Sequence, residues 1–134
     1  MRDITFSDEH WPIVEMIFPS YPTTDEVVWF LQKLEELFAR QETFAAVIVS
    51  GMSDNAARDK QATKKLMGWV KQNKPRFSQY CRGIVYVIEA SAVQYAAAKL
   101  FSKMSGPRFY GCPVNTVRSK QDGLAWAQGQ IGGQ

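Results

Sequence analysis

The sequence is poor in the residues that most often carry catalytic chemistry. Its 134 residues include two cysteines, Cys81 and Cys112, and a single histidine, His10. A lone histidine without clustered cysteines or carboxylates makes a poor metal site and a poor partner for a nucleophile. The chain also lacks a G-x-G-x-x-G sequence after a strand, a Walker-type loop and a C-x-x-C pair. We therefore expect no enzymatic activity, no cofactor and no bound metal.

Long hydrophobic runs are absent as well. No stretch approaches the roughly 18 consecutive apolar residues of a membrane span. Neither an apolar signal core nor a small-residue cleavage site follows Met1-Arg2-Asp3. Cys81 and Cys112 are far apart in the sequence, and we expect two buried thiols; a disulfide bridge or a metal pair is the alternative. These absences together predict a cytoplasmic protein.

The sequence does contain enough apolar residues for a core. Hydrophobic residues make up 46% of the chain and aromatic residues 13%, so a core forms without disulfides or metal. A chain of this length suits one domain. We expect a single domain over residues 1–131, followed by a flexible tail at residues 132–134.

The first half of the sequence predicts two strands, a helix and a further strand. Residues 4–6 predict a short strand that ends at residues 7–10, and residues 11–18 predict a second strand in a hairpin with the first. Thr23 and Glu26 form a capping box, and the apolar stripe that follows predicts a helix through about Arg40. The unbroken apolar run at residues 44–49 predicts an interior strand.

The second half repeats this alternation. The predicted elements are a helix at residues 56–73 that Pro75 stops, a strand at 84–88 and a helix at 91–104. A weaker strand within 108–117, which Gly111 and Pro113 narrow to 114–117, and a helix from 119 follow. Gly106 and Pro107 are expected to follow the end of the helix at 91–104. The order ββαβαβαβα predicts an α/β fold with a mixed, mainly parallel sheet of four to five strands and right-handed crossovers.

Several short features follow one another in a distinctive order over residues 11–131. They are Trp11-Pro12, Phe18-Pro19, Thr24 with Glu26, Phe44-Ala45, Trp69, Cys81 before Gly83, and Ala125-Trp126-Ala127. In this order they resemble the STAS-like proteins, in particular a bacterial branch related to sporulation anti-sigma-factor antagonists and to CRAL-TRIO lipid-transfer domains. The resemblance implies a sheet of four or five strands with helices and no enzymatic activity.

The resemblance also draws attention to the segment after the strand at residues 44–49. In the anti-sigma-factor antagonists this place carries a phosphorylatable serine within an Asp-Ser-Ser-Gly-like motif. Here the segment reads Ser50-Gly51-Met52-Ser53-Asp54, which departs from that motif. The lipid-transfer relatives hold a hydrophobic ligand in a cavity, and 134 residues leave no room for the additional helices that enclose a large one.

Ser50, Gly51, Ser53 and Asp54 are the first candidate binding residues. Their loop follows the carboxyl end of an interior strand, where open α/β sheets bind ligands. The helix after the loop directs free amides and a partial positive charge toward the same place, which suits a phosphate or carboxylate. In the alternative interpretation, Ser53 or Asp54 only caps that helix.

The charges are unevenly distributed. Residues 1–57 carry three basic and ten acidic residues, whereas residues 58–134 carry thirteen basic and three acidic residues. A basic stretch runs from Arg58 to Arg76 and holds seven bases, Lys71 and Lys74 among them, against one acid, Asp59. Its first four bases complete the candidate site: Arg58, Lys60, Lys64 and Lys65. This stretch predicts either a solvated helix face, a surface for an acidic protein partner, or a surface for anionic lipid. Nucleic acid ranks last, because no recognised binding motif accompanies the bases.

These observations predict a non-enzymatic, cytoplasmic protein-interaction or regulatory module of the STAS-like type that binds a protein partner. The alternative is a domain that binds a small hydrophobic or lipid-like ligand. The opposite charges of the helices at 23–40 and 56–73 can pair within the chain or between two copies. We expect a weak or moderate homodimer, in which apolar surface assists the exposed ion pairs.

Overall fold

The computed structural model describes residues 4–19, 22–51, 59–88, 96, 99–100 and 106–132 of the chain. The strands are β1 (Thr5–His10), β2 (Ile13–Pro19), β3 (Phe44–Gly51), β4 (Cys81–Val87) and β5 (Val114–Val117). The helices among these residues are α1 (Thr24–Ala39), α2 (Lys60–Gln72), α3 (Lys74–Tyr80), α5 (Gly106–Tyr110) and α6 (Lys120–Gly132). The predicted α/β class is therefore confirmed. Of the helix predicted at 91–104, residues 96, 99 and 100 are described and are helical, while the rest lies outside the described residues.

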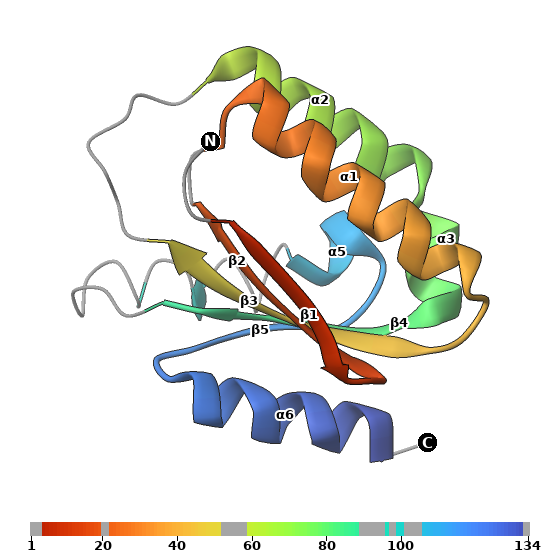
Figure 1. Cartoon of the computed structure of the whole chain (residues 1–134), viewed down its shortest axis with the longest axis vertical. Coiled ribbons are helices and arrows are strands. Elements are labelled where there is room, and N and C mark those ends of the chain that lie inside the picture. The colour runs from red at the N-terminus through yellow and green to blue at the C-terminus, as the bar shows by residue number, and fades with distance from the viewer. Residues whose placement is uncertain are drawn as a thin grey trace.

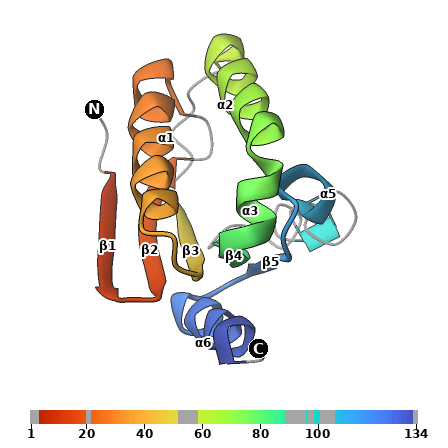
Figure 2. The ribbon, with the colours of Figure 1, turned by 90° about the vertical axis from the view of Figure 1, so that its right-hand side faces the viewer.

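The five strands form one mixed sheet in the order β1-β2-β3-β4-β5. β1 and β2 are antiparallel, whereas each later strand runs parallel to its predecessor. β3 and β4 are parallel neighbours with Val47 opposite Val85, and both side chains are fully buried, as the two apolar runs predicted. Right-handed crossovers between successive parallel neighbours place their helices on one face of the sheet. Accordingly α1, α2, α3 and α5 cover one face, and α6, which follows the last strand, covers the other (Figures 1 and 2).

The larger core lies beneath α1, α2 and α3. The predicted capping box at the start of α1 is present: the Glu26 amide donates to the Thr23 hydroxyl over 3.2 Å, and the Thr23 amide donates to the Glu26 carboxylate over 2.8 Å. The apolar stripe of α1 is buried as predicted, and its Phe38 packs edge-on against Phe77 of α3 with ring centroids 5.1 Å apart. Complete burial of a Leu or Phe side chain contributes about 1.5–3 kcal/mol.

The hairpin differs from the prediction at its turn. Residues 7–10 belong to β1 instead of ending it, and Trp11 and Pro12 form the turn before β2. β1 is an edge strand with mostly exposed side chains, so its polar residues do not interrupt it. Charged residues on such an edge also discourage pairing with other chains.

The predicted end of the second helix before Pro75 is confirmed, because α2 ends at Gln72, but a further short helix follows that the sequence did not predict. Helix α3 begins at Lys74 immediately after α2, with Pro75 in its first turn. Proline is tolerated there because the first amides of a helix have no intrahelical partner. The fully buried Phe77 supplies the tertiary contact that holds α3 in place.

The segment before β5 also differs from the prediction. Gly106 and Pro107, which were expected to follow the end of a helix, belong to the short helix α5. The strand after it spans Val114–Val117, as the sequence predicted for this weaker strand. None of the helices in the described part of the chain is long and apolar enough to cross a membrane.

Candidate functional site: a basic groove between α2 and α5

The loop predicted as the binding site is only partly described. Ser50 and Gly51 are the last residues of β3, in register with Phe18 and Pro19 of β2. Ser53, Asp54 and Arg58 lie outside the described residues.

The predicted capping of the second helix by Ser53 or Asp54 is corrected. The N-cap of α2 is Asp59, whose carboxylate accepts the amides of Gln61 and Ala62 over 3.0 and 3.1 Å. Helix α2 therefore begins at Lys60 and not near residue 56. The sequence offered several residues able to cap, and local pattern alone does not choose among them.

Helix α2 separates an inner apolar side from an outer basic side. Ala62 and Val70 are fully buried against the core, and Leu66 and Trp69 are partly buried beside them. The Trp69 ring stacks on Phe38 with centroids 6.2 Å apart, so this tryptophan packs inward. The outward side carries the lysines and other residues that do not pack in the core.

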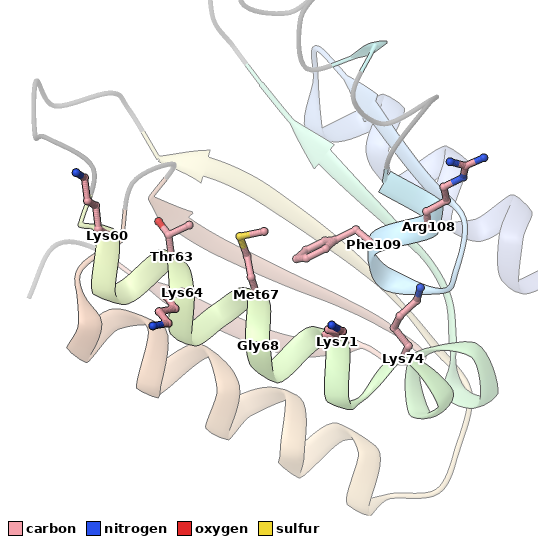
Figure 3. A pocket seen from close by; sticks show the side chains of 9 residues that line it. All are labelled: Lys60, Thr63, Lys64, Met67, Gly68, Lys71, Lys74, Arg108 and Phe109. Carbon is pink, nitrogen blue, oxygen red and sulfur yellow. The ribbon is translucent and has the colours of Figure 1, made fainter.

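A groove of about 750 Å³ lies along this outward side, between α2 and α5. Its lining residues, shown in Figure 3, are Lys60, Thr63, Lys64, Met67, Gly68, Lys71, Lys74, Arg108 and Phe109. The side chains of Met67 and Phe109 extend toward each other from the two helices (Figure 3). Met67 is 51% exposed although it is a large apolar residue. Apolar floor with a polar margin is the usual composition of a binding site.

The groove is strongly positive. Five of its nine lining residues are lysine or arginine, and none is acidic. Within the described part of the chain, no ion pair joins any of these five cations to a carboxylate. Arg76 from the same basic stretch is different, because both of its terminal nitrogens lie 3.0 Å from the Glu35 carboxylate. The groove thus brings together five cations that have no counter-charge among the described residues.

The predicted site residues do not all lie together. Lys60 and Lys64 line the basic groove, whereas Lys65 lines a smaller groove of about 500 Å³ between α1 and α2. Two acidic residues of α1, Glu35 and Glu36, line that second groove with it. Lys65 therefore lies on a different surface from Lys64, its neighbour in sequence.

Sequence reasoning missed five residues of the groove, of which Thr63 is a polar residue of α2 without a distinctive local signal. Met67 and Gly68 lie outside the inner apolar stripe of α2, and an unexplained methionine beside a glycine on the polar side of a helix was an available signal. Arg108 and Phe109 come from α5, a segment in which the sequence indicated only a weak strand. No local pattern indicates that α5 packs beside a helix that begins more than forty residues earlier.

Both thiols are buried, and the Cys112 thiol is held in its protonated form. Cys81 and Cys112 are free cysteines with exposed fractions of 3% and 5%, which confirms the expected burial. The hydrogen bond with Cys81, together with burial, raises the pKa of the Cys112 thiol far above its ordinary value. A thiol held in its protonated form is a weak nucleophile and a weak metal ligand.

Two tyrosines beside these thiols are held neutral in the same way. The hydroxyl groups of Tyr86 and Tyr110 are hydrogen-bonded to each other. Burial raises the pKa of Tyr86 to about 12 and raises that of Tyr110 as well. In the part of the chain that the structure describes, no three His, Cys, Asp or Glu side chains cluster as metal ligands.

Comparison with known proteins does not assign the chain to a family, since no family model, no curated protein and no solved structure matches it.

Proposed function

We propose that the chain is a non-enzymatic, cytoplasmic protein-interaction or regulatory module of the STAS-like type, and that it binds an acidic segment of a protein partner in the groove between α2 and α5. One observation carries the proposal: five cations surround an exposed apolar floor, and no described carboxylate pairs with them. The STAS-like assignment rests on the order of short features along the sequence, and the mixed sheet with helices on both faces agrees with it.

The two components of the groove supply different parts of an interaction. Unpaired lysines and arginines attract an acidic partner over several ångströms and raise the rate of association. Apolar contact with Met67 and Phe109 removes surface from water and slows dissociation. Methionine, aromatic residues and arginine are the residues enriched at protein interfaces, and the groove contains all three.

A small hydrophobic or lipid-like ligand is the second candidate. The groove volume of about 750 Å³ falls within the range of roughly 300–1,000 Å³ that small-molecule sites occupy. Native mass spectrometry of the purified protein separates the two candidates. If the protein retains an acyl chain, the lipid-like ligand is supported. If its mass is that of the protein alone, the protein partner is favoured.

The proposed function is tested by comparing two neighbouring lysines of α2. Lys64→Gln removes one cation from the groove, whereas Lys65→Gln removes one from a different surface of the same helix. We expect Lys64→Gln to lower the affinity for a partner captured from native cytosol by about three- to five-fold, since an exposed ion pair contributes up to about 1 kcal/mol. Lys65→Gln should bind as the wild type does. Equal binding of the wild type and both variants would contradict the proposal.

A further inference from the structure

Gly68 is a glycine for which the fold itself gives no reason. It lies inside α2, where glycine is the least favourable residue apart from proline. A Cβ atom built at this position meets no heavy atom within 4 Å among the described residues. The core therefore does not require the missing side chain. What the glycine does provide is an open floor in the groove, next to the exposed Met67.

The cations are arranged as a row and not as a cluster. Lys60, Lys64 and Lys71 follow one another along α2, and Lys74 continues the row at the start of α3. At 1.5 Å per helical residue, the row from Lys60 to Lys71 is about 16 Å long. A single anionic head group reaches only one or two such cations. An elongated ligand with carboxylates along its length can reach all of them.

We propose that the groove binds an acidic amphipathic α-helix of the partner protein, which lies along α2 and places a large apolar side chain over Gly68, beside Met67. This inference rests on the proposed function and narrows it to one class of partner. Packed helix axes are separated by about 8–10 Å, and the separation depends on the side chains at the contact. A glycine at the contact lets the partner helix approach closely, while glutamates on its flanks reach the lysines of the row.

The first test uses a synthetic peptide as the probe. The peptide has about 15 residues, or four helical turns, with leucines on one face and glutamates beside them. A scrambled peptide of the same composition keeps the charge but loses the amphipathic face. We expect the amphipathic peptide to bind about ten-fold more tightly than the scrambled one in calorimetric titration. We also expect its affinity to fall as salt is added.

The second test separates the role of Gly68 in binding from its effect on stability. Gly68→Ala should raise the melting temperature by about 3 °C, because alanine favours the helix, and should nevertheless weaken peptide binding. Gly68→Leu fills the floor and should reduce the affinity by about ten-fold or more. Gly129→Ala in α6 is the matched control, since Gly129 also has no neighbour within 4 Å of a built Cβ but lies on the other face of the sheet. It should raise the melting temperature and leave peptide binding unchanged.

Three results would overturn the inference: unchanged peptide affinity in Gly68→Leu, equal affinity for the scrambled peptide, or binding to anionic phospholipid vesicles without binding to the peptide. Its failure is distinguishable from that of the proposed function. If capture of a partner depends on Lys64 but is unaffected by Gly68→Leu, the proposed interaction module is retained and only the amphipathic helix is rejected as its ligand.

Discussion

Gly83 in β4 shows how one residue determines the distance between a helix and the sheet. A Cβ atom at this position would lie 2.6 Å from Cη2 and 2.8 Å from Cζ3 of Trp126 in α6. Both distances are shorter than any stable contact between carbon atoms, so a methyl group at this position would force the Trp126 ring or the helix to shift. The missing side chain of Gly83 is thus what allows α6 to pack directly on the strand.

We expect Gly83→Ala to lower the free energy of unfolding by about 1–3 kcal/mol, as overpacking of a core does. Chemical denaturation of the variant measures the change. Combining it with Trp126→Leu should recover part of the loss, because the smaller side chain leaves room for the methyl group. Additive losses in the double variant would show that Trp126 is not the group that opposes the methyl group.

Helix α6 is also attached to the sheet by charge. The Glu15 side chain in β2 is 11% exposed, and its two oxygens each lie 2.7 Å from a basic nitrogen, one of Lys120 in α6 and one of His10 in β1. The hydrogen bond with Lys120 lowers the pKa of Glu15, burial opposes this change, and the hydrogen bond with His10 lowers the pKa further. A carboxyl group with a lowered pKa in the folded state stabilises the fold at pH values above its ordinary pKa. This contribution is lost as the pH falls through the lowered value.

We therefore expect Glu15→Gln to lower the free energy of unfolding at pH 7 by about 1 kcal/mol, the upper end for an ion pair that water still reaches. The difference from the wild type should shrink as the pH falls below the ordinary glutamate pKa of about 4.3. Denaturation of both proteins across this pH range measures it. Glu9→Gln, an exposed carboxyl group in the same hairpin, is the control. A difference independent of pH would show that Glu15 acts by its shape and not by its charge.

Over the whole molecule, the acidic and basic parts of the sequence pair partly within the chain. Arg76 of α3 binds Glu35 of α1 with two nitrogens, and its guanidinium group lies 4.6 Å from the centre of the Phe38 ring. Arg40, at the end of α1, forms an ion pair with Asp8 of β1 over 2.6 Å. Acids engaged in this way are less able to attract the basic helix of a second copy.

For this reason we expect the homodimer to be weak and to depend on salt. Sedimentation velocity at low ionic strength should show concentration-dependent association that disappears at about 0.5 M salt, where charges are screened beyond a few ångströms. Lys65→Gln should leave this association nearly unchanged if the basic groove is the surface involved, and Lys64→Gln should weaken it. A dimer that persists at high salt, or a monomer at every concentration, would contradict the prediction.

The sequence by itself determined the elements whose signals are local. The capping box at Thr23 and Glu26 and the apolar stripe after it predicted α1, and the uninterrupted apolar runs predicted β3 and β4 as buried parallel neighbours. Four of the nine groove residues were also visible, since Lys60 and Lys64 were candidate site residues and Lys71 and Lys74 belong to the same basic stretch. Caps, periodicity and charge runs depend on residues only a few positions apart.

Only the tertiary structure decided the features that depend on distant neighbours. Helix α3 begins at Lys74 with Pro75 in its first turn and Phe77 buried in the core, whereas the sequence predicted only that the preceding helix ends before Pro75. The groove exists because α5 brings Phe109 opposite Met67, and Gly68 acquires its significance only there. Lys64 and Lys65 are adjacent in sequence but face different surfaces, because successive residues of a helix point about 100° apart and the fold decides what each direction meets.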